Sequence, residues 1–145
     1  MSVMVRDTTD TPDIRLEEKP PSADEYRRLR IDVGLSPKSA DAARLGLAGT
    51  WYGVTLRDGD RAIGMGRIVG DGGCFFQIVD IAILPAYRRK GRGARVMDAL
   101  MRHLRAHAPA SAYVSLLADG DATKLYAKFG FRDTAPASVG MALKL

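Results

Sequence analysis

The 145-residue sequence predicts a single α/β domain whose mixed, mostly antiparallel sheet is flanked by helices. Segments with the apolar spacing of strands alternate with segments that have the spacing of helices. An Asp-Gly-Asp turn at 58–60 joins two β-rich runs, and an apolar stripe at helical spacing occupies 94–107. The predicted order of elements is β-α-α-β-β-β-α-β-α-β, with a flexible tail at 1–12 and one domain at 13–145.

The N-terminal third of the domain predicts one strand followed by two helices. Ile14 and Leu16 indicate a short strand that ends before two consecutive prolines. Ser22 and Glu25 have the spacing of a capping box, in which each side chain accepts a hydrogen bond from a backbone N–H at the start of a helix. A second helical segment is expected at 39–47, ended by a glycine.

The middle of the sequence predicts a meander of three antiparallel strands. Residues 51–69 form two strands around the 58–60 turn, and a glycine-rich turn at 70–73 leads into a third run at 74–84. This third run, CFFQIVDIAIL, is almost continuously apolar, which is typical of a central strand covered on both faces.

The C-terminal half alternates helix and strand. The helix at 94–107 is followed by a strand at 112–117 and by a second helix at 121–129, which Gly130 closes. The last segment, 138–145, is predicted to be a final strand. No internal repeat interrupts this order.

Positive charge is concentrated in one element. The chain has a net charge of +5, and the segment 88–105 alone carries seven Lys or Arg side chains against one acid, a balance of +6. Such a concentration favours binding of a compact polyanion. The alternative is a solvated basic helix face.

Several classes of protein are disfavoured by composition. The single cysteine, Cys74, cannot form an internal disulfide, and His103 and His107 are too few for a metal site. We therefore expect no metal and, because neither a secretion signal nor a membrane-spanning run is visible, a cytoplasmic protein that does not bind a membrane.

Two glycine-rich stretches compete as phosphate-binding loops. Gly64 to Gly70 has the glycine spacing of a dinucleotide loop, but a turn and a strand follow it where that motif requires a helix. The basic loop at 88–93 lies between a strand and a helix, so its bare backbone and the amide groups of the helix start favour a phosphate there. No Walker sequence is present.

Three motifs in order resemble one enzyme family. Residues 88–93, RRKGRG, match the pattern Q/R-x-x-G-x-G/A of the GNAT superfamily of acyl-CoA-dependent N-acetyltransferases. The preceding VDIAILP is similar to the fourth strand of that family, and LYAKFGF at 125–131 is similar to its later L-Y-x-x-x-G-F motif. One departure is visible, because Asp119 stands where many members have Asn.

The resemblance implies a sheet that splays between its fourth and fifth strands, with acetyl-CoA as co-substrate. The strand backbone would pair with the pantetheine arm, and loop amides would hold the pyrophosphate while the basic side chains neutralise charge. Which basic residue meets the 3′-phosphate stays open. The cofactor-binding residues implied are Ile81, Ala82, Ile83, Arg88, Arg89, Lys90, Gly91, Arg92, Gly93, Ala94 and Asp119.

The resemblance also implies catalytic roles for two residues. Tyr126 corresponds to the family tyrosine that protonates the departing thiolate, although its spacing alone favours a core aromatic. Asp80 is the carboxylate nearest the expected thioester. It either accepts the proton of the amine, directly or through a water, or only forms structural hydrogen bonds.

The acceptor site is less defined by sequence. The aromatic residues at 51–52 and 75–76, Gln77, the first two helices and the loop 134–138 are candidates to line it. A cationic acceptor would require carboxylates, and the three nearby candidates are Asp80, Glu25 and Asp32.

The sequence thus predicts an N-acetyltransferase that acts on the primary amine of a small molecule by direct attack in a ternary complex. A protein lysine or N-terminal acetyltransferase and a non-catalytic acyl-CoA sensor are the alternatives. A nucleic-acid binder is disfavoured because the basic residues cluster at a glycine loop instead of spreading among aromatics. The chain is expected to be a monomer or a homodimer.

Overall fold

The computed structural model of the chain describes residues 13–145, so the predicted tail at 1–12 lies outside the described residues. Its five strands form one sheet in the order β1-β2-β3-β4-β5, in which β1 to β4 are antiparallel and β5 is parallel to β4. This arrangement confirms the predicted mixed, mostly antiparallel sheet. The strands are β1 (Ile14–Glu17), β2 (Tyr52–Asp58), β3 (Arg61–Gly70), β4 (Phe75–Ile83) and β5 (Tyr113–Leu116).

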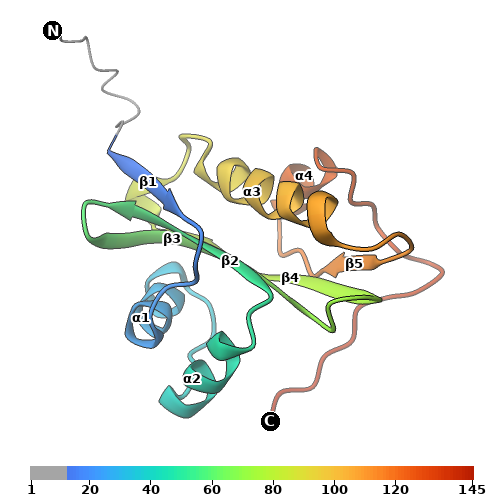
Figure 1. Cartoon of the computed structure of the whole chain (residues 1–145), viewed down its shortest axis with the longest axis horizontal. Coiled ribbons are helices and arrows are strands. Elements are labelled where there is room, and N and C mark those ends of the chain that lie inside the picture. Colours follow the sequence, from blue (N-terminus) through green and yellow to red (C-terminus); the bar gives the residue numbers. More distant parts are fainter. Residues whose placement is uncertain (1–12) are drawn as a thin grey trace, which may run out of the picture.

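Helices cover both faces of the sheet. Figure 1 shows α1 and α2 on one face and α3 and α4 on the other. No helix within residues 13–145 is both long and apolar enough to cross a membrane. The helices are α1 (Ala23–Val33), α2 (Ala40–Ala48), α3 (Arg92–His107) and α4 (Ala122–Ala127), with a short 3₁₀ turn at Pro85–Tyr87.

Local signals place the first two helices. Ser22 and Glu25 form the predicted capping box at the start of α1, and Ser39 accepts a hydrogen bond from the backbone N–H of Ala42 at the start of α2. Gly34 ends α1 in the left-handed conformation, at a φ of 87°. The apolar stripe of α3 is buried against the sheet as predicted.

The most completely covered strand is β3, where residues 62–68 are all buried. The prediction that the strand at 74–84 is covered on both faces is therefore wrong in its second half. Residues 79–81 of β4 are only partly buried. The physical reason is that this half of β4 borders an opening in the sheet, described below.

The predicted final strand at 138–145 is absent from the structure. The segment has the apolar alternation of a strand, but alternation specifies only which side chains share a face. A strand also needs a neighbouring backbone to pair with, and none pairs with this segment among the described residues. The side chains of Val139, Met141, Leu143 and Leu145 are exposed as a result.

Candidate active site

The sheet opens between β4 and β5, as predicted. The two strands pair from Phe75 and Tyr113 to Ile78 and Leu116, and beyond that point β4 continues to Ile83 without a partner in β5. A cavity of about 940 Å³ occupies the opening. Its walls are the outer half of β4, the loop before α3, the first turn of α3, and α4.

A β-bulge in β4 accompanies this opening. Met65 of β3 faces Ala82 and Arg67 faces Val79, so two steps along β3 oppose three steps along β4. Asp80 lies in the bulge and has a φ of 61°. Because a bulge bends its strand and increases the local twist, it favours divergence of the outer half of β4 from β5.

Gly66 of β3 allows α3 to pack against the bulge. A Cβ at this position would lie 2.5 Å from Cγ1 of Val96 on α3 and 2.9 Å from Cδ1 of Ile81 on β4. Any larger residue would displace the helix or the strand, since the interior is close-packed. Gly66 is one of the glycines whose spacing at 64–70 resembles a dinucleotide-binding loop. In the structure it serves close packing between β3, β4 and α3.

The N-terminus of α3 faces the cavity without a side-chain cap. Gly91 is the N-cap residue, at a φ of 74°, and no side chain hydrogen-bonds to the cap, in contrast to Ser22 and Ser39 on the first two helices. Arg89 also has a positive φ, 66°. The first amide groups of a helix carry the positive end of its dipole, so this end of α3 can receive an anion.

The basic side chains of the loop divide into two groups. Arg92 is buried and donates to the carbonyl of Tyr87 at 3.1 Å, and Arg88 donates through Nε to the carbonyl of Ile83 at 2.9 Å. Arg89 and Lys90 are exposed. All the predicted site residues line the cavity except Lys90.

Tyr126 is half-buried on α4 and lines the same cavity. Burial raises the pKa of its phenol above the ordinary value of 10.0, and the nearby charge of Asp119 raises it further. The phenol is therefore protonated at neutral pH, in the state required of a proton donor.

Asp80 is the centre of a buried ionic network. Its Oδ1 atom lies 2.5 Å from Nη1 of Arg30, and its Oδ2 atom lies 2.9 Å both from Nε of Arg67 and from the hydroxyl of Tyr26. The carboxylate side chain is only 6% exposed. Arg67 in turn donates to the carbonyl of Gly46 on α2 and to the hydroxyl of Thr50. The network therefore connects both α1 and α2 to the bulge of β4.

A second cavity, of about 780 Å³, adjoins the first. We call it the acceptor-side cavity. It shares Asp80 and Val79 with the first cavity and extends from there to the α1–α2 connection and to the last residues of the chain. The residues it adds are Ser36, Pro37, Lys38, Ser39, Ala42, Gln77 and the segment Ala142, Leu143, Lys144 and Leu145.

Most residues proposed from sequence for the acceptor lie elsewhere. Gln77 lines the acceptor-side cavity, but Phe75 is exposed and Phe76 is buried in the core. Trp51 packs on Phe76 with ring centroids 4.5 Å apart. The loop 134–138 does not line this cavity, whereas the chain end does. No local signal could have identified Ser36 or Lys38, because only the tertiary structure brings them beside β4.

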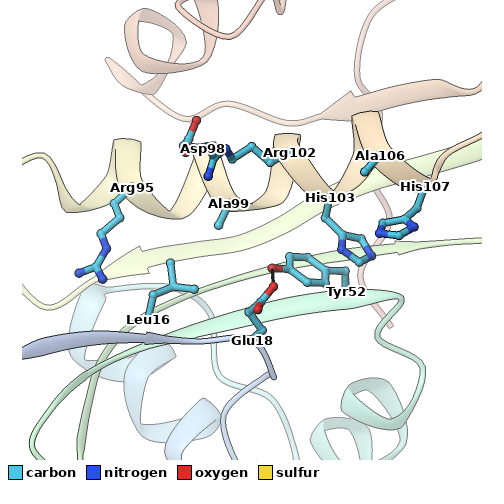
Figure 2. Close-up of a pocket in the computed structure, with 10 residues that line it drawn as sticks. All are labelled: Leu16, Glu18, Tyr52, Arg95, Asp98, Ala99, Arg102, His103, Ala106 and His107. Atoms are coloured by element: carbon cyan, nitrogen blue, oxygen red, sulfur yellow. Dashed lines mark hydrogen bonds and ion pairs between the residues drawn. The ribbon is translucent and has the colours of Figure 1, made fainter.

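A third cavity, of about 480 Å³, lies between α3 and strands β1 and β2. Figure 2 shows the ring of Tyr52 parallel to that of His103, with centroids 3.7 Å apart, and the Tyr52 hydroxyl donates to Glu18 at 2.7 Å. His103 is half-buried, and burial together with the nearby charge of His107 lowers its pKa. No group of three or more His, Cys, Asp or Glu side chains among residues 13–145 is arranged to hold a metal ion.

The open sheet, the bulged fourth strand and the uncapped helix beside them define the acetyltransferase fold of the GNAT type. The profile of the acetyltransferase (GNAT) family matches residues 12–131, which is most of the chain. The chain therefore belongs to this family.

Solved structures agree with this assignment. A probable acetyltransferase of unknown function from meticillin-resistant Staphylococcus aureus is 46% identical, with a TM-score of 0.87 over 91% of this chain and 99% of that chain. A GNAT-family acetyltransferase from Streptococcus pneumoniae is 20% identical, with a TM-score of 0.73 over 91% and 97% of the two chains. At that identity the likeness shows the fold alone. No curated protein sequence matches the chain significantly.

Proposed function

We propose that this chain transfers the acetyl group of acetyl-CoA to the primary amine of a small molecule by direct attack in a ternary complex. One observation carries the proposal. One cavity is bordered by the uncapped N-terminus of α3, by the unpaired edge of β4 and by α4, which carries the hydroxyl of Tyr126. These are the three features that a diphosphate, an extended arm and a thiolate leaving group would require.

The phosphate end of acetyl-CoA fits the N-terminus of α3. Amide groups at 91–94 would hold the pyrophosphate, and the left-handed backbone of Arg89 and Gly91 supports the narrow loop that presents them. Arg92 is committed to the Tyr87 carbonyl, so its contribution is mainly structural. Arg89, exposed at the cavity, is the better candidate for a side-chain contact with phosphate.

The thioester end fits the outer half of β4. Residues 81–83 lie at a strand edge that β5 does not pair with, and an extended pantetheine arm can take that place. An amide group at the bulge would then polarise the thioester carbonyl. Hydrogen bonds to a developing oxyanion are worth about 3–4 kcal/mol in such sites.

The reaction forms a C–N bond and breaks a C–S bond. The lone pair of a neutral amine attacks the carbonyl carbon, the thiolate leaves with the C–S electron pair, and Tyr126 donates its proton to the sulfur. The proton lost by the amine passes to solvent. Keeping an alkylamine of pKa about 10.4 neutral at pH 7 costs roughly 4.6 kcal/mol, so a dry, positively charged site that lowers the amine pKa assists the step.

Asp80 is a weaker candidate for the base. Two arginines and one tyrosine hydroxyl already donate hydrogen bonds to its oxygens. Accepting a proton would break this buried network. A water that relays the proton from the amine is therefore our preferred route, with Asp80 holding the bulge in place.

Two alternatives remain on the same fold. A non-catalytic acyl-CoA sensor would not need a protonated phenol at the sulfur, so Tyr126 favours an enzyme. A protein lysine or N-terminal acetyltransferase is the second alternative, and acetylation of a lysine-containing peptide under the same assay would identify it. We expect the enzyme to act in the cytoplasm, where the exposed free thiol of Cys74 would stay reduced.

The test is binding of CoA by isothermal titration calorimetry, combined with thiol release from acetyl-CoA in the presence of amines. Gly91→Val should reduce CoA affinity at least tenfold, because a β-branched residue disfavours a φ of 74°. No atom outside its neighbours lies within 4 Å of the Gly91 Cβ position, so the fold should survive.

Gly59→Val is the matched control. Gly59 has a φ of 60° and equally open surroundings, but it lies in the β2–β3 hairpin away from the cavity. This variant should bind CoA normally at a similar cost in stability. Equal CoA affinity of both variants would refute the proposal that the N-terminus of α3 binds the pyrophosphate of CoA.

A further inference from the structure

The two cavities meet at the bulge of β4. Val79 and Asp80 line both cavities. An amine that enters through the acceptor-side cavity therefore reaches the segment of β4 where the acetyl group is proposed to lie. The side chains of that cavity then decide which amines are accepted.

None of the three side-chain carboxylates considered for a cationic acceptor is available at this cavity. Asp80 is paired with Arg30 and Arg67. Glu25 accepts two hydrogen bonds from Arg57, at 2.8 and 3.0 Å, and this pairing lowers its pKa from 4.5 to about 2. Asp32 is exposed on α1 and does not line the cavity. Two of the three carboxylates are thus paired with arginines, and the third lies outside the cavity.

The unpaired side-chain charges that line the cavity are positive. Lys38 and Lys144 line the acceptor-side cavity, and neither ammonium group forms an ion pair within residues 13–145. Gln77 of β4 lines the same cavity, is half-buried and makes no side-chain hydrogen bond within the same residues. Together with the network around Asp80, in which two guanidinium groups face one carboxylate, this wall attracts anions.

We infer that the acceptor is a primary amine that also carries an anionic group, a carboxylate or a phosphate, which the Lys38 and Lys144 side of the cavity holds. The inference rests on the proposed acetyl transfer. The same positive wall disfavours a second ammonium group, so polyamines and aminoglycoside-like polycations are rejected by repulsion. It also lowers the pKa of the bound amine, which raises the reactive neutral fraction.

The experiment compares amines that differ in the anion alone. Thiol release from acetyl-CoA is measured with β-alanine against its carboxamide and with O-phosphoethanolamine against ethanolamine, each rate expressed per neutral amine, and with spermidine as the polycation. We expect kcat/KM to be about tenfold higher for the anionic member of at least one pair, and the ratio to shrink as salt rises. The pair that responds distinguishes carboxylate from phosphate.

Charge-reversing variants locate the effect. Lys38→Glu and Lys144→Glu should each lower kcat/KM for the preferred anionic amine about fivefold, and should lower that value more than the value for ethanolamine. Lys19→Glu, at an exposed lysine that lines none of the described cavities, is the control and should change neither value. Calorimetric titration of the anionic amine into the CoA complex gives a second readout, in which the two cavity variants should bind more weakly.

Equal rates within both pairs, or a preference for spermidine, would overturn the inference while leaving the acetyltransferase proposal intact. CoA binding without acetylation of any amine would overturn the inference and favour the sensor. Absence of CoA binding would overturn both proposals, so the two failures are distinguishable.

Discussion

Asp80 combines two features that are individually uncommon. Its backbone is left-handed, with a φ of 61°, and its carboxylate is buried between two arginines. Aspartate tolerates this conformation better than most residues, but the cost is still of the order of 1–3 kcal/mol and must be offset by the surroundings. The three contacts to the carboxylate provide that offset and hold the bulge in one conformation.

Asp80→Asn should therefore act on stability and positioning. The side chain keeps its shape but loses its charge, which leaves Arg30 and Arg67 partly uncompensated in a buried place. We expect the free energy of unfolding to fall by about 3 kcal/mol and the KM for acetyl-CoA to rise, measured by urea denaturation and steady-state kinetics. Asp32→Asn, at an exposed site on α1, is the control. A variant of unchanged stability that loses the acidic limb of its kcat/KM profile would identify Asp80 as the base instead.

Tyr126 should matter for chemistry and not for binding. Removing its hydroxyl in Tyr126→Phe deprives the leaving thiolate of its acid, so kcat should fall at least tenfold while the calorimetric affinity for CoA stays within twofold. Because burial and Asp119 raise the phenol pKa above 10.0, wild-type kcat should decline only above about pH 10, and the variant should lack that decline. Tyr113→Phe, on the exposed edge strand, controls for loss of a hydroxyl. A fully active Tyr126→Phe enzyme would exclude the acid role.

At the scale of elements, α1 is attached to the sheet by charge as well as by apolar contact. Glu25 caps α1 and also receives two hydrogen bonds from Arg57 of β2. The same helix carries Tyr26 and Arg30, which bind Asp80 on β4. Docking of α1 thus affects the bulge directly.

This attachment predicts a specific pH dependence. The pKa of Glu25 is about 2 in the folded chain against 4.5 for an ordinary glutamate, mainly because Arg57 hydrogen-bonds to it. Its contribution to stability is therefore complete above about pH 4.5 and is lost as the pH falls toward 2. Glu25→Gln should have a lower Tm than wild type at pH 6, and thermal scans should show the gap closing between pH 4.5 and pH 2.

Asp24→Asn removes an exposed acid from the same turn and should keep the wild-type pH dependence of Tm. If the difference in Tm between Glu25→Gln and wild type is constant from pH 6 to pH 2, ionisation of Glu25 does not contribute to stability through the pair with Arg57.

At the scale of the whole molecule, apolar surface gathers at the chain end. Val139, Met141, Leu143 and Leu145 are each at least 67% exposed, and they alternate as one face of a strand would. The outer edge of β5, the last strand of the sheet, has no partner among the described residues. A second copy of the chain would cover both surfaces, which favours the homodimer over the monomer.

We therefore expect light scattering at tens of micromolar protein to give about twice the chain mass of 15.7 kDa. Changing Met141 and Leu143 together to serine should produce monomers, because the apolar face is lost. The exchange Met141→Leu with Leu143→Met keeps that face and should preserve the dimer. A monomer at every concentration would disprove this prediction.

The sequence alone was sufficient wherever the determining interactions are local. The sequence features in question are the capping box at Ser22, the stripe of α3, the Asp-Gly-Asp hairpin and the loop at 88–93. Each involves residues a few positions apart, so the spacing was enough to predict the elements. The motifs at 88–93 and 125–131 predicted the family in the same way.

Only the tertiary structure decided the partners of Asp80 and the residues that line the second cavity. Asp80 meets Arg30 and Tyr26 across 50 and 54 residues of chain, and no periodicity records such partners. The final segment illustrates the same limit, since its alternation predicted a strand but could not supply a neighbouring backbone. Local patterns determine which groups share a face, whereas long-range packing decides which charges are neutralised and which remain unpaired.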